Sequence, residues 1–107
     1  MIEIDQKTGK AEELKIIDFG FAEINPGLSR ICCGTPSYMA PELMQKNEYD
    51  PFEVDLWAIG VVIFRMVTGS YPFGSDKEQT LSANVNNCYV KYPTYLSRAC
   101  KRLIQSC

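Results

Sequence analysis

Asp18-Phe19-Gly20 and Gly34-Thr35-Pro36-Ser37-Tyr38-Met39-Ala40-Pro41-Glu42 are the two stretches that decide the fold of this chain. The first places a carboxylate, an aromatic ring and a glycine directly after an isoleucine-rich run that favours a β-strand. The second ends on Pro41-Glu42, a pair that suits the first turn of a helix. Asp-Phe-Gly alone is a common tripeptide, whereas both stretches in this order and spacing form a specific signal.

Two further stretches follow in order, Asp55-Leu56-Trp57-Ala58-Ile59-Gly60 and Gly69-Ser70-Tyr71-Pro72-Phe73. Together the four stretches resemble the activation segment and the following helices of a eukaryotic serine/threonine protein kinase domain. The likeness to calcium/calmodulin-dependent-like kinases is looser. The resemblance implies a mainly α (α+β) fold, a fragment of the carboxy-terminal lobe with an amino-terminal β-hairpin and a buried central helix.

The resemblance also implies a division of the chain. Residues 1–107 would form a partial protein kinase domain, with a hairpin at 1–22, an activation segment at 18–42 and a helical C-lobe at 41–107. The residues themselves favour strands at 1–4 and 14–17, because turn-forming residues lie at 5–10. We interpret the intervening stretch 11–13 as a solvated extension of the loop.

Helix signals are clear after Pro41, which suits the first position of a short helix. Asp55 is predicted to cap a helix that runs to Thr68 and is apolar on nearly every side. Such a helix needs cover on all sides, which a chain this short can supply only incompletely, so we expect an exposed apolar patch to remain. A capping box at 75–78 predicts a polar helix as far as Val85, which the asparagines at 84, 86 and 87 would end. Residues 96–97 open the last predicted helix, with Ala99, Cys100, Leu103 and Ile104 on one apolar stripe.

Functional roles follow from the resemblance residue by residue. Asp18 would bind Mg²⁺, Phe19 would pack in the core of the enzyme, and Gly20 would supply backbone freedom, so ATP and Mg²⁺ are the implied cofactors. Thr35 would position the substrate loop against the catalytic aspartate, which this sequence lacks. The structural residues of the substrate wall would be Gly34, Tyr38, Pro41, Glu42 and Asp55. Without the family, Glu42 is a first-turn helix residue and Asp55 a plain helix cap.

Ser29 is the only hydroxyl-bearing residue between Gly20 and Gly34, which makes it the candidate phosphorylation site of this segment. The position where such kinases commonly carry that hydroxyl is Ile31 here. The alternative interpretation of Ser29 is an ordinary loop serine.

Composition places the chain among globular proteins, with 46% hydrophobic and 22% charged residues. The formal net charge of -2 is scattered, without the basic stripe that nucleic-acid binding requires, and no apolar run is long enough to span a membrane. We therefore expect a cytoplasmic protein, with the nucleus as an alternative.

The five cysteines occur without histidine or a Cys-x-x-Cys pair, so we expect free thiols and no zinc site. A redox role for Cys32-Cys33 is a further alternative.

The expected function is that of part of a serine/threonine kinase, which transfers the ATP γ-phosphate to protein hydroxyls. Its implied partners are a protein substrate and the rest of the kinase domain. The sequence contains no glycine-rich phosphate loop, strand lysine or His-Arg-Asp, so we expect the isolated chain to be inactive. The alternative is a non-catalytic, pseudokinase-like interaction or scaffold fragment.

Overall fold

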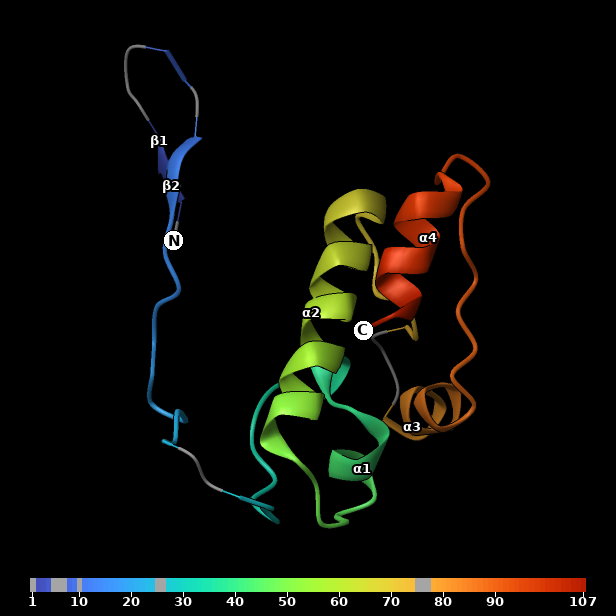
Figure 1. Cartoon of the computed structure of the whole chain (residues 1–107). Coiled ribbons are helices and arrows are strands. Elements are labelled where there is room, and N and C mark those ends of the chain that lie inside the picture. The colour runs from blue at the N-terminus through green and yellow to red at the C-terminus, as the bar shows by residue number, and fades with distance from the viewer. Residues whose placement is uncertain (1, 5–7, 10, 25–26, 75–77) are drawn as a thin grey trace.

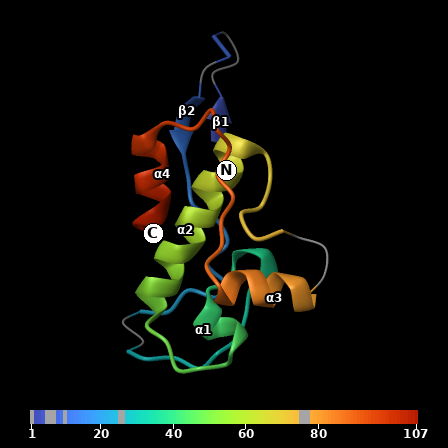
Figure 2. The same cartoon turned by 90° about the vertical axis from the view of Figure 1, so that its right-hand side faces the viewer.

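The computed structural model describes residues 2–4, 8–9, 11–24, 27–74 and 78–107. Its elements are strands β1 (Ile2–Ile4) and β2 (Ala11–Leu14), the 3-10 helix η1 (Pro36–Tyr38), and helices α1 (Pro41–Met44), α2 (Pro51–Thr68), α3 (Glu78–Asn86) and α4 (Arg98–Gln105). Helix α2 is the axis of the body: α4 lies beside it, while α1 and α3 lie together near its amino-terminal end (Figures 1 and 2). The described part of the chain is mainly helical, as expected.

The two strands pair antiparallel, with Ile2 opposite Leu14 and Ile4 opposite Ala11. The pair stands to one side of the helical body (Figure 1). The prediction of a second strand at 14–17 is wrong, because β2 ends at Leu14. The prediction of a loop at 11–13 is also wrong, because β2 begins at Ala11. Ile16 is 82% exposed and belongs to no described strand. Most of the predicted turn, residues 5–7 and 10, lies outside the described residues.

Helix α2 begins earlier than the sequence predicted. Its cap is Asp50, whose Oδ1 accepts a hydrogen bond of 2.9 Å from the N–H of Phe52. Pro51 takes the first helical position, where its fixed φ favours the helix and its missing N–H costs nothing. The prediction that Asp55 caps this helix is therefore wrong, and Asp55 lies exposed one turn inside it. The helix ends as predicted at Gly69, which adopts a φ of 74° and donates its N–H to the Arg65 carbonyl.

The hydrophobic core joins α2 to α3 and to the loop between them. Its buried side chains are Val61, Phe73, Leu81 and Val85. The ring of Trp57 stacks on Phe73, with centroids 5.4 Å apart and planes 8° apart. Asn84 was predicted to help end α3, but it lies inside the helix and donates from Nδ2 to the Phe73 carbonyl at 3.0 Å. This bond ties α3 to the loop, so Asn84 supports the helix it was expected to break.

Helix α4 is confirmed, with Ser97 as its cap: the Ser97 Oγ accepts from the N–H of Cys100 at 3.2 Å. Its residue Ile104 is buried, whereas Leu103, predicted for the same stripe, is 53% exposed. The chain passes close to α2 here, since a Cβ built on Gly60 would lie 2.8 Å from the Cys107 Cβ. Gly60 therefore permits the approach of α4. The predicted cap of α3, residues 75–77, lies outside the described residues.

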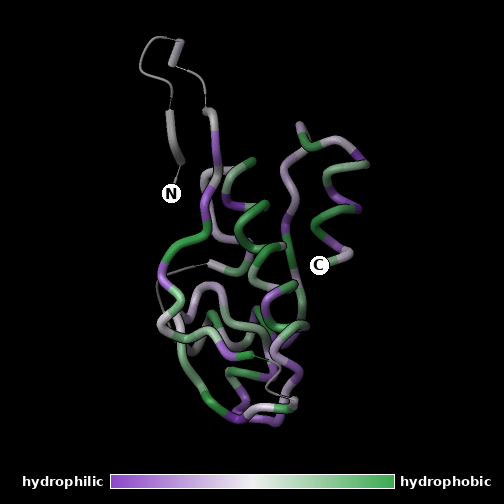
Figure 3. The backbone as a smooth tube through the Cα atoms, turned by 60° about the vertical axis from the view of Figure 1, so that its left-hand side comes forward, coloured by the Kyte–Doolittle hydropathy of each residue, from purple (hydrophilic) through white to green (hydrophobic). Residues whose placement is uncertain are grey.

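One face of α2 carries exposed apolar side chains, so the described chain surrounds this helix only incompletely, as predicted, and the central helix is not fully buried. Phe52, Ile59 and Met66 are 69%, 51% and 79% exposed, and Leu56 lies between them. Their spacing places them on a single face of the helix, which we call the α2 stripe. Figure 3 shows hydrophobic residues along most of α2. The other face is the one that α4, η1 and the core cover.

No helix in the described residues is long and apolar enough to cross a membrane. All five cysteines are free, as the sequence predicted.

Removing the Phe73 side chain should destabilise the fold strongly, because the ring is buried and stacks on Trp57. Phe73→Ala is expected to cost about 3 kcal/mol or more of unfolding free energy. Phe52→Ala, at an exposed position of the stripe, is the matched control and should change it by less than about 1 kcal/mol. Urea unfolding followed by circular dichroism tests the pair. Equal losses for the two variants would refute this account of the core.

The α2 stripe should drive self-association, since contiguous exposed apolar surface favours contact with another apolar surface. Ile59→Gln combined with Met66→Gln should lower the apparent mass in sedimentation without loss of helicity. Ile24→Gln is the control, because Ile24 is fully exposed but lies off the helix. A wild-type chain that stays monomeric at high concentration would contradict the prediction.

Candidate functional site

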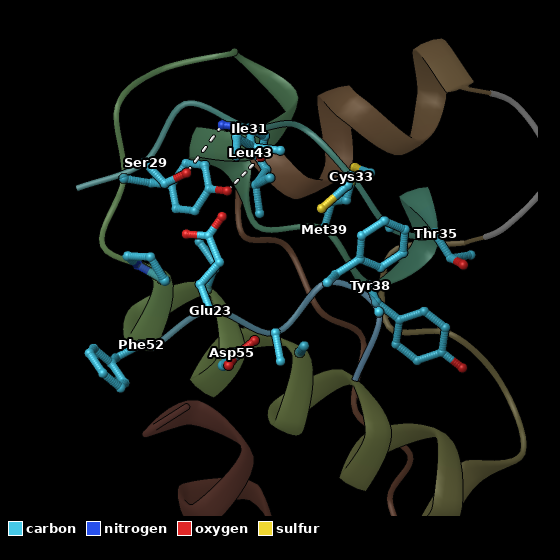
Figure 4. A pocket seen from close by; sticks show the side chains of 18 residues that line it. Glu23, Ser29, Ile31, Cys33, Thr35, Tyr38, Met39, Leu43, Phe52 and Asp55 are labelled. Atoms are coloured by element: carbon cyan, nitrogen blue, oxygen red, sulfur yellow. Dashed lines mark hydrogen bonds between the residues drawn. The ribbon is translucent and has the colours of Figure 1, made fainter. Parts of the chain in front are cut away.

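A cleft of about 550 Å³ opens between the segment after Asp18 and the first half of α2. It gathers side chains or backbone of predicted site residues that are far apart in the sequence: Gly20, Ser29, Gly34, Thr35, Tyr38 and Asp55. Figure 4 shows the Glu23 carboxylate in the cleft and the hydroxyls of Thr35 and Tyr38 turned away from Glu23. Sequence reasoning had not selected Glu23. Asp18, Phe19, Pro41 and Glu42 do not line this cleft.

The wall of the cleft is anchored by Tyr49. Ser29 and Tyr49 exchange two backbone hydrogen bonds, of 2.9 and 3.0 Å. The Tyr49 hydroxyl donates to the Ile31 carbonyl at 2.5 Å, and the Ile31 N–H donates to the Ser29 Oγ at 3.2 Å (Figure 4). The loop is thus pinned at 29–31 to the chain just before α2. The Ser29 hydroxyl is engaged in this anchor, and its phosphorylation stays a prediction.

Asp18 has a left-handed backbone, with a φ of 64°. A non-glycine residue in this region is uncommon and stores strain, a feature that clusters at functional sites. Gly20 donates its N–H to the Asp18 Oδ1 at 3.3 Å. The expected reason for Gly20 was backbone freedom, yet the positive φ falls on Asp18 and Gly20 has none. Gly20 instead gives room to the carboxylate, because a Cβ there would lie 3.2 Å from Oδ1.

The remaining predicted residues lie outside this arrangement. Phe19 is 69% exposed, so its predicted packing partners are not among the described residues. Pro41 begins α1, as predicted. Glu42 is half-buried in the first turn of α1 and has no cation within 4 Å in the described part of the chain.

The Asp18 carboxylate suits Mg²⁺ as one ligand among several. Asp18 offers an exposed carboxylate, while the described residues contain no group of three or more His, Cys, Asp or Glu that could hold a metal. Mg²⁺ in phosphate-transfer sites is typically held by one or two carboxylates together with substrate phosphates and water. A lone carboxylate therefore suits this ion better than one that needs a full protein cage.

A second cluster joins η1, α2 and the loop after α2. Arg65 donates from Nη1 to the Tyr38 hydroxyl at 2.6 Å and to the Tyr71 hydroxyl at 2.5 Å. Its guanidinium also lies 4.4 Å from the centroid of the Tyr71 ring, and the two tyrosine rings meet edge to face at 5.5 Å. Sequence reasoning selected Tyr38 but missed Arg65 and Tyr71. The available signal was Arg65 itself, the one charged residue between Leu56 and Thr68.

The cluster shifts the proton affinities of its members. The hydrogen bond with Tyr71, followed by the one with Arg65, lowers the pKa of Tyr38 below its usual value. The hydrogen bond with Tyr38 is the main cause that raises the pKa of Tyr71. The same partners raise the pKa of the Arg65 guanidinium, led by the hydrogen bond with Tyr38. Tyr38 is therefore the phenol of this pair that ionises first, and Arg65 stays charged.

The helical lobe and its cleft bring together residues from the motifs that resemble a protein kinase, and the comparison with known proteins identifies this class. The chain belongs to the protein kinase domain family, whose model matches residues 2–107.

Several similar curated proteins are serine/threonine kinases. The serine/threonine-protein kinase kin-29 of Caenorhabditis elegans is 40% identical over 99 residues, which are 91% of this chain and 12% of that protein. The serine/threonine-protein kinase ATG1b of Arabidopsis thaliana is 44% identical over 98 residues, 86% of this chain and 14% of that protein. The SIK3 homolog of Danio rerio is 39% identical over 94 residues, 86% of this chain and 8% of that protein. The chain is thus part of a protein kinase domain that is similar to those of serine/threonine kinases, and it spans only a small share of these relatives.

Tyr38 should lose its proton at lower pH than Tyr71 and Tyr92, because its pKa is lowered and theirs are raised. Tyr38→Phe is expected to remove the lowest-pH step that these three tyrosines contribute to an ultraviolet titration, whereas Tyr92→Phe should not, because burial raises the pKa of Tyr92. Because the folded state releases this proton before the unfolded state does, Tyr38 contributes stability that grows as the pH rises through its folded-state pKa towards 10. An unchanged first step in Tyr38→Phe would contradict the assignment.

Proposed function

We propose that this chain supplies the metal-binding aspartate and the substrate wall of a serine/threonine kinase, which transfers the ATP γ-phosphate to hydroxyls of a protein substrate. The observation that carries the proposal is the cleft that unites Gly20, just after Asp18, with Thr35 and Asp55. These residues come from three separate stretches of the sequence. A phosphoryl-transfer enzyme works mainly by positioning and electrostatic stabilisation, so such a convergence is what the reaction needs.

Each residue has a distinct proposed role. The Asp18 carboxylate would hold Mg²⁺, which neutralises phosphate charge when bound. Its position is defined by the left-handed backbone and by the Gly20 N–H. Thr35 lies at the start of η1, where its carbonyl accepts the N–H of Tyr38 at 3.0 Å, so its hydroxyl is held on a structured turn beside the cleft. Gly34, with a φ of 110°, sets the direction of the chain into that turn.

We propose further that the rest of a kinase domain covers the α2 stripe and the exposed Phe19, and that the isolated chain does not transfer phosphate. Both features are apolar surfaces for which the described residues supply no cover. The proposed setting is cytoplasmic.

Two substitutions in a complete kinase domain that carries this segment test the proposal. Asp18→Asn should abolish transfer and weaken productive Mg-ATP binding, because the amide cannot serve as an anionic ligand. Thr35→Ala should lower kcat by about 10²-fold and leave the KM for ATP nearly unchanged, since small errors of position are costly. Kinetic titrations of ATP and of a serine peptide separate the two effects.

The matched control for Thr35→Ala is Thr94→Ala, at an exposed turn far along the chain from the cleft. The isolated chain in the same assay should show no transfer. A Thr35→Ala substitution that leaves kcat unchanged would refute the proposed role of this wall. So would a complete kinase domain carrying this segment that prefers tyrosine peptides.

A further inference from the structure

The Arg65 guanidinium is a positioned cation without a carboxylate partner in the described part of the chain. The ion pairs found there join Lys15 to Glu13 and Arg30 to Glu48. What surrounds Arg65 instead is two phenol oxygens and the face of the Tyr71 ring. Neither neutralises its charge, and both restrict its rotamers. An arginine held by neutral groups keeps its full attraction for an anion.

The geometry of the hydrogen bonds leaves the binding edge open. A guanidinium carries five N–H donors, and both bonds to the tyrosines come from Nη1. The N–H groups of Nε and Nη2 point to the opposite side in parallel, and this pair forms the two-pronged contact with a carboxylate or phosphate. The side chain is exposed, so an incoming ligand can reach this edge. Nη1 serves as the anchor and the Nε–Nη2 edge as the receptor.

The cluster is continuous with the proposed substrate wall. Tyr38, which accepts from Arg65, belongs to η1 and also lines the cleft, and η1 follows Thr35 directly. Arg65 is thus joined by one hydrogen bond to a residue of the proposed substrate wall.

We propose that Arg65, held by Tyr38 and Tyr71, binds the oxyanion of an acidic side chain in the protein substrate, either the carboxylate of Asp or Glu or the phosphate of a phosphorylated residue. The inference rests on the proposed function, because it takes the wall at Thr35 to be the substrate side. It adds a specificity-determining residue: the enzyme would favour substrates with a negative charge at one fixed position from the accepting serine.

The test measures peptide binding to the full 107-residue chain by fluorescence anisotropy. Serine peptides carry one Asp, moved along the sequence, and are compared with the Asn peptide at each position. One position should favour Asp by about 3- to 10-fold, and the preference should shrink as salt rises, because the contact is exposed. A phosphoserine peptide and a glutamate peptide at that position distinguish the two sources of the oxyanion.

Four variants assign the preference. Arg65→Gln should abolish it, and Arg65→Glu should reverse it in favour of Lys. Tyr71→Phe should reduce it, because the charge remains but one anchor is lost. Arg98→Glu is the charge-matched control, on the exposed start of α4, and should keep the preference. Circular dichroism verifies that each variant is folded.

The outcomes separate this inference from the proposed function. An absence of acid preference at every position, or a preference that survives Arg65→Gln, overturns the inference. If the complete kinase transfers phosphate to serine peptides without that preference, the proposed function stands and the inference fails. If acid-selective binding depends on Arg65 but the complete domain transfers nothing to serine or threonine, the anion site stands and the proposed function fails.

Discussion

The stack of Trp57 on Phe73 is the contact on which the helical body depends. It joins α2 to the loop that follows it, and that loop then meets α3 through the bond from Asn84 to the Phe73 carbonyl. Because α2 is held in this rotation about its axis, Arg65 faces η1 and the α2 stripe faces away from the core. The position of the candidate site and the location of the uncovered surface are thus two results of one packing constraint.

Local signals in the sequence predicted the helices well where a cap or a proline acts alone. Pro41 and Ser97 each begin a helix as expected, and Gly69 ends one. The errors arose where two local signals compete. Asp50-Pro51 and Asp55 both suit the start of α2, and the earlier pair prevails because it combines a cap with a proline at the first position. The second strand is Ala11–Leu14 and not 14–17, so isoleucine content alone was a misleading guide to its position.

The candidate site, like the fold, was predictable from the sequence in some parts and not in others. The motifs at 18–20 and 34–42 are contiguous in the sequence, so their residues could be selected without a structure, and the cleft brings many of them together. Their environment could not be predicted: the positive φ of Asp18 has no signal in the sequence, and the anchoring of Ser29 to Tyr49 joins residues 20 positions apart. Arg65 meets Tyr38 across 27 positions, and only the rotation of α2 decides whether an arginine in an apolar helix faces a tyrosine or solvent.

Trp57 has a consequence for the study of this protein in solution. It is the single tryptophan of the chain, and its indole N–H is buried without a hydrogen-bond partner among the described residues. The emission of an indole depends on the polarity around it, so the intrinsic fluorescence of the chain reports on one place, the junction of α2 with Phe73. In a nitrogen-labelled sample the same group gives one indole resonance. Trp57 is therefore an intrinsic spectroscopic probe. Its emission and its indole resonance should change when another surface covers the helical lobe or when the packing of the lobe loosens.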